Sequence, residues 1–193
     1  MNVLHVCANP KPTEESVCKQ LATSFFATLV QKNPDVEMNN VDLYQDPPPY
    51  YDYSAFRGFW MPIIEEGYQA SNEQKKAIEY ASTQAELFNQ ADVLVLTTPM
   101  WNFSLPAILK AWIDQILSPG LTFTLDREGV HPLHRIRRIV MLVASGGVYK
   151  EEDERDALTR LVRAAFGFVN IADVEIAWAD GQNPLFNQDS DER

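Results

Sequence analysis

Residues 97–117 join an apolar run to an amphipathic helix through four flat or apolar side chains, Met100-Trp101-Asn102-Phe103. Pro99 disfavours helix in the residue before it, and Pro106 suits the first turn of the following helix, with Ser104 close to its N-cap. The backbone N–H groups of this segment are therefore expected to lack strand or helix partners. A planar heteroaromatic ligand with acceptors along one edge, such as an isoalloxazine ring, could stack on the side chains and accept from the amides.

A second segment, "ASGGVY" (144–149), also follows an apolar run. Its paired glycines, Gly146 and Gly147, permit positive φ angles and a close approach of the backbone to a ligand. The alternative is that the glycines serve only a tight turn between a strand and a helix. Taken together with the segment around Trp101, the two glycines favour a ligand site that is built from two loops.

A third segment, "ANPKPTEES" (8–16), precedes a helical pattern that begins near Ser16. The unpaired N–H groups and the positive dipole end of a helix N-terminus favour phosphate binding, and Lys11 adds one cation. Glu14 and Glu15 would repel a phosphate. The segment is predicted to bind a phosphate group, with the helix amides outweighing the two carboxylates.

The rest of the pattern predicts the elements that carry these loops. Short runs rich in Val, Leu and Ile are typical of strands covered on both faces, and more polar runs are typical of edge strands. Strands are predicted at 2–7, 36–43, 93–99, 139–144 and 174–178. Helical spacing of apolar residues falls at 17–29, 78–88, 108–116 and 158–165. This alternation predicts an α/β fold: a flavodoxin-like, doubly wound sheet of five parallel strands in the order 2-1-3-4-5, with helices on both faces.

Ligands of such sheets bind beyond the carboxyl ends of the strands, where all three loops would lie. Residues 44–70 include "DPPPYYDYSAFRGFW" and are too long for an ordinary connection, so they are predicted to form a long aromatic loop over the active site. The whole chain, 1–193, is predicted to be a single domain, with 183–193 as a polar tail.

Composition and charge argue against several classes of partner. The net charge of -11 opposes binding to the phosphate backbone of nucleic acids. No apolar run is long enough to span a membrane, and Met1 leads almost directly into a strand-like run without a charged signal-peptide region, so a cytoplasmic protein is expected. Cys7 and Cys18 show neither CxxC spacing nor a nearby His partner, which argues against a metal site.

Three motifs resemble those of the FMN-dependent NADH-azoreductase and quinone-reductase family of the flavodoxin-like fold. "PMWNFSLP" (99–106), "GLTF" (120–123) and "SGGVY" (145–149) are similar, in order, to that family's P-M-[YW]-N-F-x-[IL]-P, G-x-T-F and S-R-G-G-x-[YH] patterns. The resemblance extends across most of the chain. Ser145 stands where the family has Arg and Ala144 where it has the preceding Ser, while Asn9 and Cys18 replace serines of its phosphate loop.

The resemblance implies an enzyme that binds FMN and transfers two electrons from NADH or NADPH to a quinone or azo compound by a ping-pong mechanism. The flavin carries the chemistry, so no protein acid or base is expected to be catalytic. The resemblance also implies a homodimer with active sites at its interface. The aromatic segment 50–60 and the apolar positions Trp112 and Leu117, which are expected to be exposed, point the same way.

The resemblance further implies which residues contact the cofactor. The phosphate is expected at the start of the first helix, the ring edge at the main chain of Asn102 and Phe103, and the pyrimidine end at the two glycines. The implied cofactor-binding residues are Asn9, Ser16, Val17, Cys18, Met100, Trp101, Asn102, Phe103, Ala144, Ser145, Gly146 and Gly147. Trp60, Phe123 and Tyr149 are expected on the substrate side.

Two other functions stay open on the sequence. A flavodoxin-like carrier of single electrons shares the fold, but the Ser/Thr- and Gly-rich phosphate loop of such carriers is absent and the aromatic segment 44–70 would have no role. A non-catalytic regulatory or ancillary subunit with a degenerate flavin site would account for the altered phosphate loop.

Overall fold

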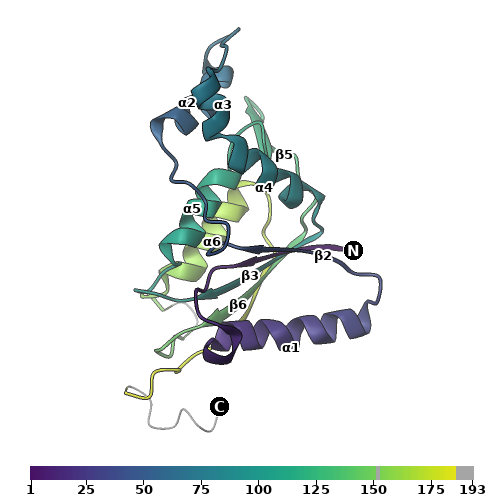
Figure 1. Cartoon of the computed structure of the whole chain (residues 1–193), viewed down its shortest axis with the longest axis vertical. Helices are drawn as coiled ribbons and strands as arrows, with labels where there is room; N and C mark the ends of the chain where they lie inside the picture. Colours follow the sequence, from purple (N-terminus) through teal and green to yellow (C-terminus); the bar gives the residue numbers. More distant parts are fainter. Residues whose placement is uncertain (151–152, 186–193) are drawn as a thin grey trace.

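A computed structural model describes residues 1–150 and 153–185. Five parallel strands form one sheet in the order β2-β1-β3-β6-β7 (Figure 1). The strands are β1 (Asn2–Cys7), β2 (Glu37–Asp42), β3 (Val93–Pro99), β6 (Arg138–Ala144) and β7 (Val174–Ala179). Counted within this sheet alone, the order is 2-1-3-4-5, as the alternation of strands and helices predicts.

Helices cover both faces of the sheet, as the sequence predicts. Figure 1 shows α1 (Val17–Lys32) on one face, and α4 (Glu79–Gln90), α5 (Ala107–Ile116) and α6 (Ala157–Phe168) on the other. A short 3₁₀ turn, η1 (Thr13–Glu15), leads into α1. Two further helices, α2 (Tyr53–Ile64) and α3 (Asn72–Ala77), pack together at one end of the molecule. The carboxyl ends of the strands all open on one edge, between α1 and the α4–α6 layer.

The core follows from the apolar runs of the central strands. Alternate side chains of these strands face opposite layers. Leu4, Leu96 and Met141 are buried in the large cluster beneath α4, α5 and α6. Val3 and Val95 belong to a smaller cluster beneath α1. Because both faces of β1, β3 and β6 are covered, these strands form a rigid base for the loops at their ends.

Residues 44–70 do not form the long loop that their length and prolines predict. Asp52 accepts a hydrogen bond from the N–H of Ala55 at 2.8 Å and caps the N-terminus of α2. The aromatic residues lie before and along this helix, where Tyr51 stacks on Phe59 with ring centroids 5.6 Å apart. Pro62 lies in the last turn of the helix, where it has no N–H to donate to the carbonyl oxygen of Gly58. A local cap therefore overrides the loop-like composition of the preceding prolines.

Trp112 is not exposed, so the prediction of its exposure is wrong. The side chain is 0% exposed and lies between α5 and α4, where its Nε1–H donates to Gln84 Oε1 at 3.1 Å. Its ring also contacts Phe88 edge-on, with centroids 6.4 Å apart. A polar partner on the neighbouring helix lets the large indole be buried completely.

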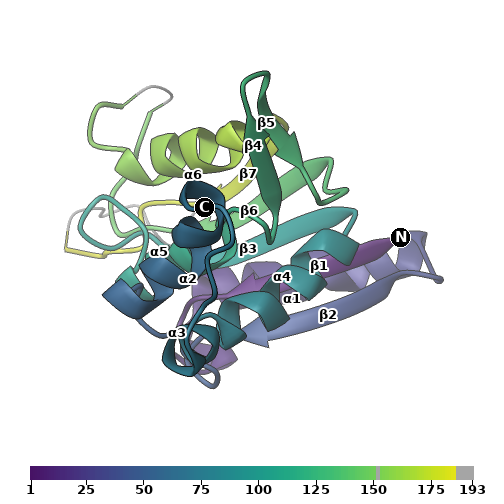
Figure 2. The ribbon, with the colours of Figure 1, turned by 90° about the horizontal axis from the view of Figure 1, so that it is seen from above.

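A two-stranded hairpin, β4 (Phe123–Asp126) and β5 (Gly129–Pro132), was not predicted from the sequence. Figure 2 shows it standing beside α6 and outside the main sheet. Asp126 Oδ1 accepts from the N–H groups of Glu128 and Gly129 and so stabilises the turn. The hairpin anchors itself through Phe123, whose ring meets Phe168 edge-on at 5.3 Å.

Two expectations from the sequence concern the membrane and the tail. Within the described residues, no helix has the length and apolar character needed to cross a membrane. Of the predicted polar tail, residues 186–193 lie outside the part of the chain that the structure describes.

His5 lies in the middle of β1, and its ring is held by two side chains. One ring nitrogen lies 3.0 Å from Asn40 Oδ1 and the other 2.9 Å from Thr97 Oγ1. Burial lowers the pKa of His5 below its ordinary value of 6.5, against the opposing effects of the Asn40 hydrogen bond and the Asp42 charge. The folded protein therefore favours the neutral ring.

Stability is expected to fall as the pH drops below about 6.5, because the unfolded chain then binds a proton that folded His5 does not take up. Stabilisation by the neutral ring is complete above the unfolded pKa and is lost as the pH falls towards the lower folded pKa. Urea unfolding at pH 7.5 and pH 5.5 measures this loss. His5→Gln should make the loss smaller, and an equal loss in wild type and variant would contradict the assignment.

Candidate functional site

A pocket of about 320 Å³ lies at the carboxyl edge of the sheet, where the three predicted loops meet. Its walls come from the start of α1, the end of β3 and the end of β6. The lining residues are Asn9, Lys11, Glu15, Ser16, Val17, Pro99, Met100, Trp101, Ala144, Ser145, Gly146 and Gln182. The structure thus brings together residues from near both ends of the described chain, from Asn9 to Gln182.

The start of α1 offers unpaired hydrogen-bond donors to this pocket. Ser16 is the N-cap, and its Oγ accepts from the N–H of Lys19 at 3.3 Å. Within the described residues, the N–H groups of Val17 and Cys18 donate to no acceptor. Helix α1 runs for 16 residues, so its dipole places a positive end at the same point. An anionic group is therefore the natural ligand for this end of the pocket.

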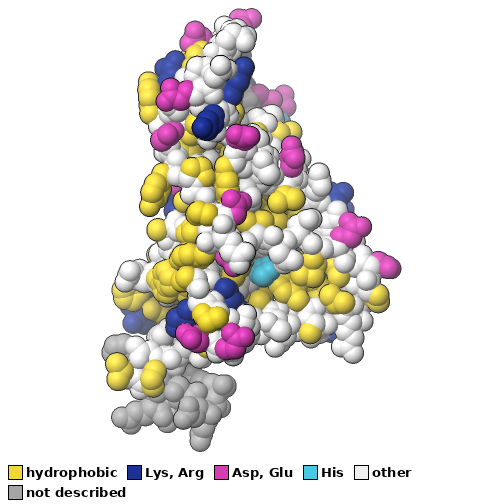
Figure 3. All heavy atoms as spheres, in the orientation of Figure 1, with side chains coloured by type: hydrophobic (Ala, Val, Ile, Leu, Met, Phe, Trp, Pro, Cys, Tyr) yellow, Lys and Arg dark blue, Asp and Glu magenta, His cyan; other side chains and the backbone are white. Residues whose placement is uncertain are grey.

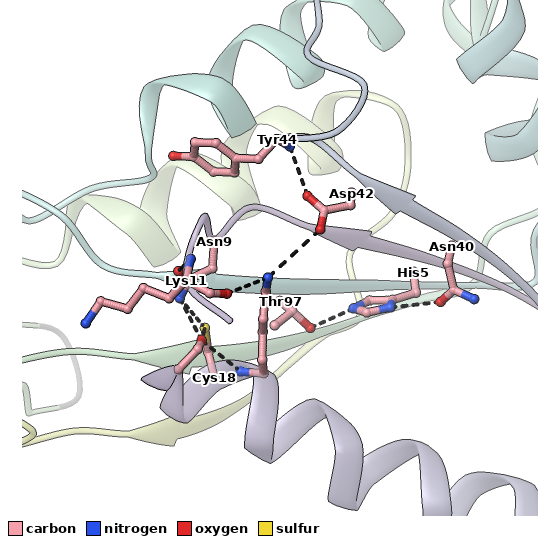
Figure 4. A network of polar contacts seen from close by, with 10 residues as sticks. His5, Asn9, Lys11, Cys18, Asn40, Asp42, Tyr44 and Thr97 are labelled. Carbon is pink, nitrogen blue, oxygen red and sulfur yellow. Dashed lines mark hydrogen bonds and ion pairs between the residues drawn. The ribbon is translucent and has the colours of Figure 1, made fainter. Parts of the chain in front are cut away.

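Asn9 holds the loop together and is almost fully buried, at 5% exposure. Its Nδ2 donates to Ser16 Oγ at 2.8 Å and to Cys18 Sγ at 3.1 Å, while its Oδ1 accepts from the N–H of Lys11 at 3.0 Å (Figure 4). The amide of Asn9 is occupied by these bonds. We expect it to shape the pocket, and the main chain of α1 to supply the donors.

Cys18 does not line the pocket, because its side chain is buried beneath Asn9 and Ser16. Only its main-chain N–H is placed to serve a ligand. Cys7 is also buried, and burial raises the pKa of its thiol above the ordinary value. No group of three or more His, Cys, Asp or Glu side chains that could hold a metal occurs in residues 1–150 and 153–185.

Lys19 helps to hold the loop between β1 and α1 in place. Its Nζ donates to the carbonyl oxygen of Lys11 at 2.7 Å and lies 3.9 Å from Asp42 Oδ2 at the end of β2 (Figure 4). Asp42 in turn accepts from the N–H of Tyr44 at 2.9 Å. The exposed side chains of Lys11 and Glu15 carry opposite charges at the mouth of the pocket. Their charges offset each other, which leaves the helix amides as the main attraction for an anion.

The segment after β3 forms a tight two-residue turn. Trp101 and Ser104 exchange two main-chain hydrogen bonds of 3.0 Å, and the φ angles of Asn102 and Phe103 between them are 47° and 68°. Two central residues with positive φ are typical of a type I′ turn, an uncommon conformation for residues other than glycine. Within the described residues, the N–H groups of Asn102 and Phe103 have no acceptor, as predicted for the segment 100–103. The prediction is wrong for Met100 and Trp101, whose N–H groups donate to Ala144 O and Ser104 O.

The loop after β6 is held by the segment that follows β7. The N–H of Ser145 donates to Ala179 O at 3.1 Å, and the N–H of Gln182 donates back to Ser145 O at 2.9 Å. Neither Gly146 nor Gly147 has the positive φ that glycine permits. At Gly146 the reason for glycine is close approach, because a Cβ there would lie 3.1 Å from the Cβ of Asn183.

Several predicted site residues lie outside this pocket. Asn102, Phe103 and Gly147 adjoin it without lining it, and Tyr149 stacks on Trp178 with centroids 5.7 Å apart. Trp60 lies in α2, packed against the cluster around Phe59. Phe123 is 1% exposed and forms part of the core, so it has no surface for a substrate. Phe123 packs the start of the β4–β5 hairpin against α6, and the prediction that it contacts a substrate is wrong.

The sequence did not predict that residues 179–183 form part of the pocket wall. Gln182 lines the pocket, and Gly181 takes a φ of 66° at the turn that returns the chain to it. The Asp180-Gly181 pair after a predicted strand was a local signal of such a turn. Pro99 was predicted as the last residue of a strand but not as a residue of the site, and it is the last residue of β3 and lines the pocket.

The flavodoxin-like fold family model matches residues 1–193, the whole chain. The chain belongs to this flavodoxin-like family. Its members with similar sequences include the FMN-dependent NADH:quinone oxidoreductase of Exiguobacterium sp. (strain ATCC BAA-1283 / AT1b), which is 33% identical over 94% of this chain and 84% of the relative. The protein of the same name from Azotobacter vinelandii is 35% identical over 88% of this chain and 83% of the relative.

Solved structures of the flavodoxin-like family agree with this assignment. The azoreductase AzrA is 30% identical, with a TM-score of 0.88 over 100% of this chain and 92% of its own. An FMN-dependent NADH-azoreductase from Bacillus anthracis, solved in complex with FMN, is 26% identical, with a TM-score of 0.82 over 98% of this chain and 91% of its own. The recognition of the family from three motifs is confirmed.

Proposed function

We propose that this flavodoxin-like chain is an FMN-dependent oxidoreductase that transfers two electrons from NADH to quinones or azo compounds by a ping-pong mechanism. The observation that carries the proposal is the pocket in which the start of α1 faces the 99–101 and 144–146 segments. The names of relatives over nearly the whole chain support the same activity. The chain would act as one FMN-binding domain.

The residues present fit FMN at the start of α1, within the pocket, and at the 101–104 turn that adjoins it. The unpaired N–H groups of Val17 and Cys18 and the hydroxyl of Ser16 suit a phosphate. The unpaired N–H groups of Asn102 and Phe103 suit the acceptors on the edge of a flavin ring, and Trp101 offers a flat surface beside them. A ligand that carries both a phosphate and a flat ring with acceptors along its edge satisfies both sets of donors. A flavin nucleotide has both features, whereas a simple anion or a simple aromatic ligand has only one.

When bound, FMN would supply the ability to accept a hydride and to pass on two electrons. The chain's own residues would bind the flavin and hold its ring in a fixed orientation. Fixed main-chain donors at the ring edge favour negative charge there, and they need no reorganisation because the turn between Trp101 and Ser104 is closed by two hydrogen bonds. Among the described residues that line the pocket, Glu15 is the one carboxylate, and it lies at the phosphate end.

Two measurements on the purified chain test the proposal. FMN added to flavin-free protein should bind with quenching of its fluorescence. The loaded protein should oxidise about one NADH per flavin without a quinone and should turn over continuously only when a quinone is supplied. Failure to bind FMN would overturn the proposed function. Binding without NADH oxidation would instead support a carrier or a non-catalytic subunit.

The chain is expected to form a homodimer. Exposed aromatic and apolar side chains gather on and before α2, including Tyr50 at 85% and Tyr53 at 70% exposure, with Phe56, Ile63 and Ile64. Figure 3 shows hydrophobic side chains gathered at the level of α5, with charged side chains among the hydrophobic ones around α2 and α3. A groove of about 800 Å³ between Tyr44–Tyr50 and the start of α5 continues this surface past Trp101. Apolar surface of this extent favours burial against a second copy.

Light scattering at micromolar concentration should give twice the chain mass of 21.9 kDa. Tyr53→Glu and Ile64→Glu together should shift the mass towards the monomer, because each places a charge in the apolar surface. Glu79→Gln, at the exposed start of α4, is a control that should leave the dimer intact. A stable wild-type monomer would contradict the prediction.

A further inference from the structure

Trp178, near the end of β7, is joined to the pocket by a short relay of hydrogen bonds. Its Nε1–H donates to Ser145 Oγ at 2.7 Å, and Ser145 Oγ donates to the carbonyl oxygen of Gly147 at 2.9 Å. An indole N–H can only donate, so Ser145 must accept from it and has its own proton left for Gly147. The direction of the relay is therefore fixed by chemistry. Ser145 is 4% exposed, which keeps competing water away.

The relay acts on the main chain that lines the pocket. Gly147 O also accepts from the N–H of Gly181 at 3.2 Å, and the carbonyl oxygen of Gly146 accepts from the N–H of Asn183 at 3.1 Å. These bonds pair residues 145–147 with residues 181–183. A fixed Ser145 hydroxyl holds the Gly147 carbonyl in the orientation that this pairing needs. Without the hydrogen bond from the Ser145 hydroxyl, the segment 145–147 would be held less firmly, and Ser145 and Gly146 of this segment line the pocket.

The indole also links the loop after β6 to the turn after β3. Its ring stacks on Tyr149 at 5.7 Å with an interplanar angle of 23°, and Phe103 meets Tyr149 edge-on at 6.5 Å. Phe103 is the second positive-φ residue of the turn. The three rings form a continuous series from β7 to the turn. Trp178 therefore contacts the loop after β6 directly and is linked to the turn after β3 through Tyr149.

We propose that Trp178 is a positioning residue for the flavin ring: its N–H fixes the Ser145–Gly147 segment, and its ring sets the spacing between that segment and the Trp101–Ser104 turn. The proposal rests on the proposed FMN function. Trp178 does not itself line the pocket and acts through Ser145 and Tyr149. Its effect should fall on the ring end of the ligand and leave the phosphate end at α1 unchanged.

The test uses Trp178→Phe, which keeps an aromatic ring against Tyr149 and removes the N–H. Affinities for FMN and for riboflavin should both weaken roughly five- to tenfold, because the ring end is common to the two ligands. The visible circular dichroism of bound flavin should change, because the ring environment is altered. Ile176→Val, two residues earlier on the same side of β7, is the matched control and should leave both affinities and the spectrum unchanged.

A double-mutant cycle separates positioning from general destabilisation. Ser145→Ala should weaken flavin binding by a similar factor, and Trp178→Phe should have no further effect in the Ser145→Ala background, because its N–H then has no acceptor. Ser145→Ala also provides the test if Trp178→Phe fails to fold. Additive effects, or an unchanged affinity and spectrum in Trp178→Phe, would overturn the role of Trp178 while wild-type FMN binding stands. Wild-type protein that binds no flavin would overturn the proposed function and, with it, this inference.

Discussion

Ser16→Asp is expected to weaken FMN binding by at least about thirtyfold while changing riboflavin affinity by less than about threefold. The substitution places a carboxylate at the N-cap of α1, within the part of the pocket that would hold the phosphate. Two charges about 4 Å apart near a protein surface repel by roughly 4 kcal/mol, and partial screening by solvent still leaves about 2 kcal/mol. Each 1.4 kcal/mol corresponds to about tenfold in affinity.

Ser16→Asn is the matched control, because Asn has the shape of Asp without its charge and caps helices equally well. It should retain most of the wild-type preference for FMN over riboflavin. Fluorescence quenching gives all the affinities. If wild-type protein bound FMN and riboflavin equally, the start of α1 would not be a phosphate site, and the non-catalytic reading of the chain would gain support.

Glu15→Gln should act in the opposite direction and more weakly. Glu15 is exposed at the mouth of the pocket, where its charge is largely screened. Removing it should improve FMN affinity by about two- to threefold at low salt, and the gain should disappear at high salt. A gain that persisted at high salt would place the carboxylate in a less solvated position than the structure gives it.

Trp112→Ala is expected to lower the free energy of unfolding by about 3–5 kcal/mol. The indole is fully buried between α4 and α5, so its removal leaves a cavity and exposes the Gln84 amide to an apolar surrounding. Trp112→Phe should cost less, about 1–3 kcal/mol, because the ring still fills most of the space but Gln84 Oε1 loses its donor. Urea unfolding of the flavin-free protein measures both changes.

Two variants check the cause. Gln84→Leu in the Trp112→Phe background should recover part of the loss, since no buried amide then lacks a partner. Trp101→Ala removes the same type of side chain from an exposed position and should change stability by less than about 1 kcal/mol. Equal losses at Trp112 and Trp101 would contradict the burial of Trp112.

The candidate site was predicted to the extent that its residues follow predicted strands. The α1 start and the segments at 99–101 and 144–146 were located because each lies at the carboxyl end of an apolar run or the start of a helical pattern. The segment after β7 was missed, because nothing in its own composition tells that it folds back on Gly146. The expected roles of Trp60 and Phe123 came from the resemblance, and the structure places neither at the pocket.

The sequence by itself determined the parallel sheet, its strand order and the edge at which the loops meet, because apolar periodicity is a local property and the rules of strand connection are general. Only the tertiary structure decided the conformation of the loops. Asn102 and Phe103 hold positive φ angles because two hydrogen bonds close their turn, and the Asn9 amide is turned inward by Ser16 and Cys18. Trp112 is buried because Gln84, on another helix, supplies its acceptor. The bonds that close the turn are local to residues 101–104, whereas Asn9 and Trp112 depend on partners from other elements. Such pairings form only when the elements pack.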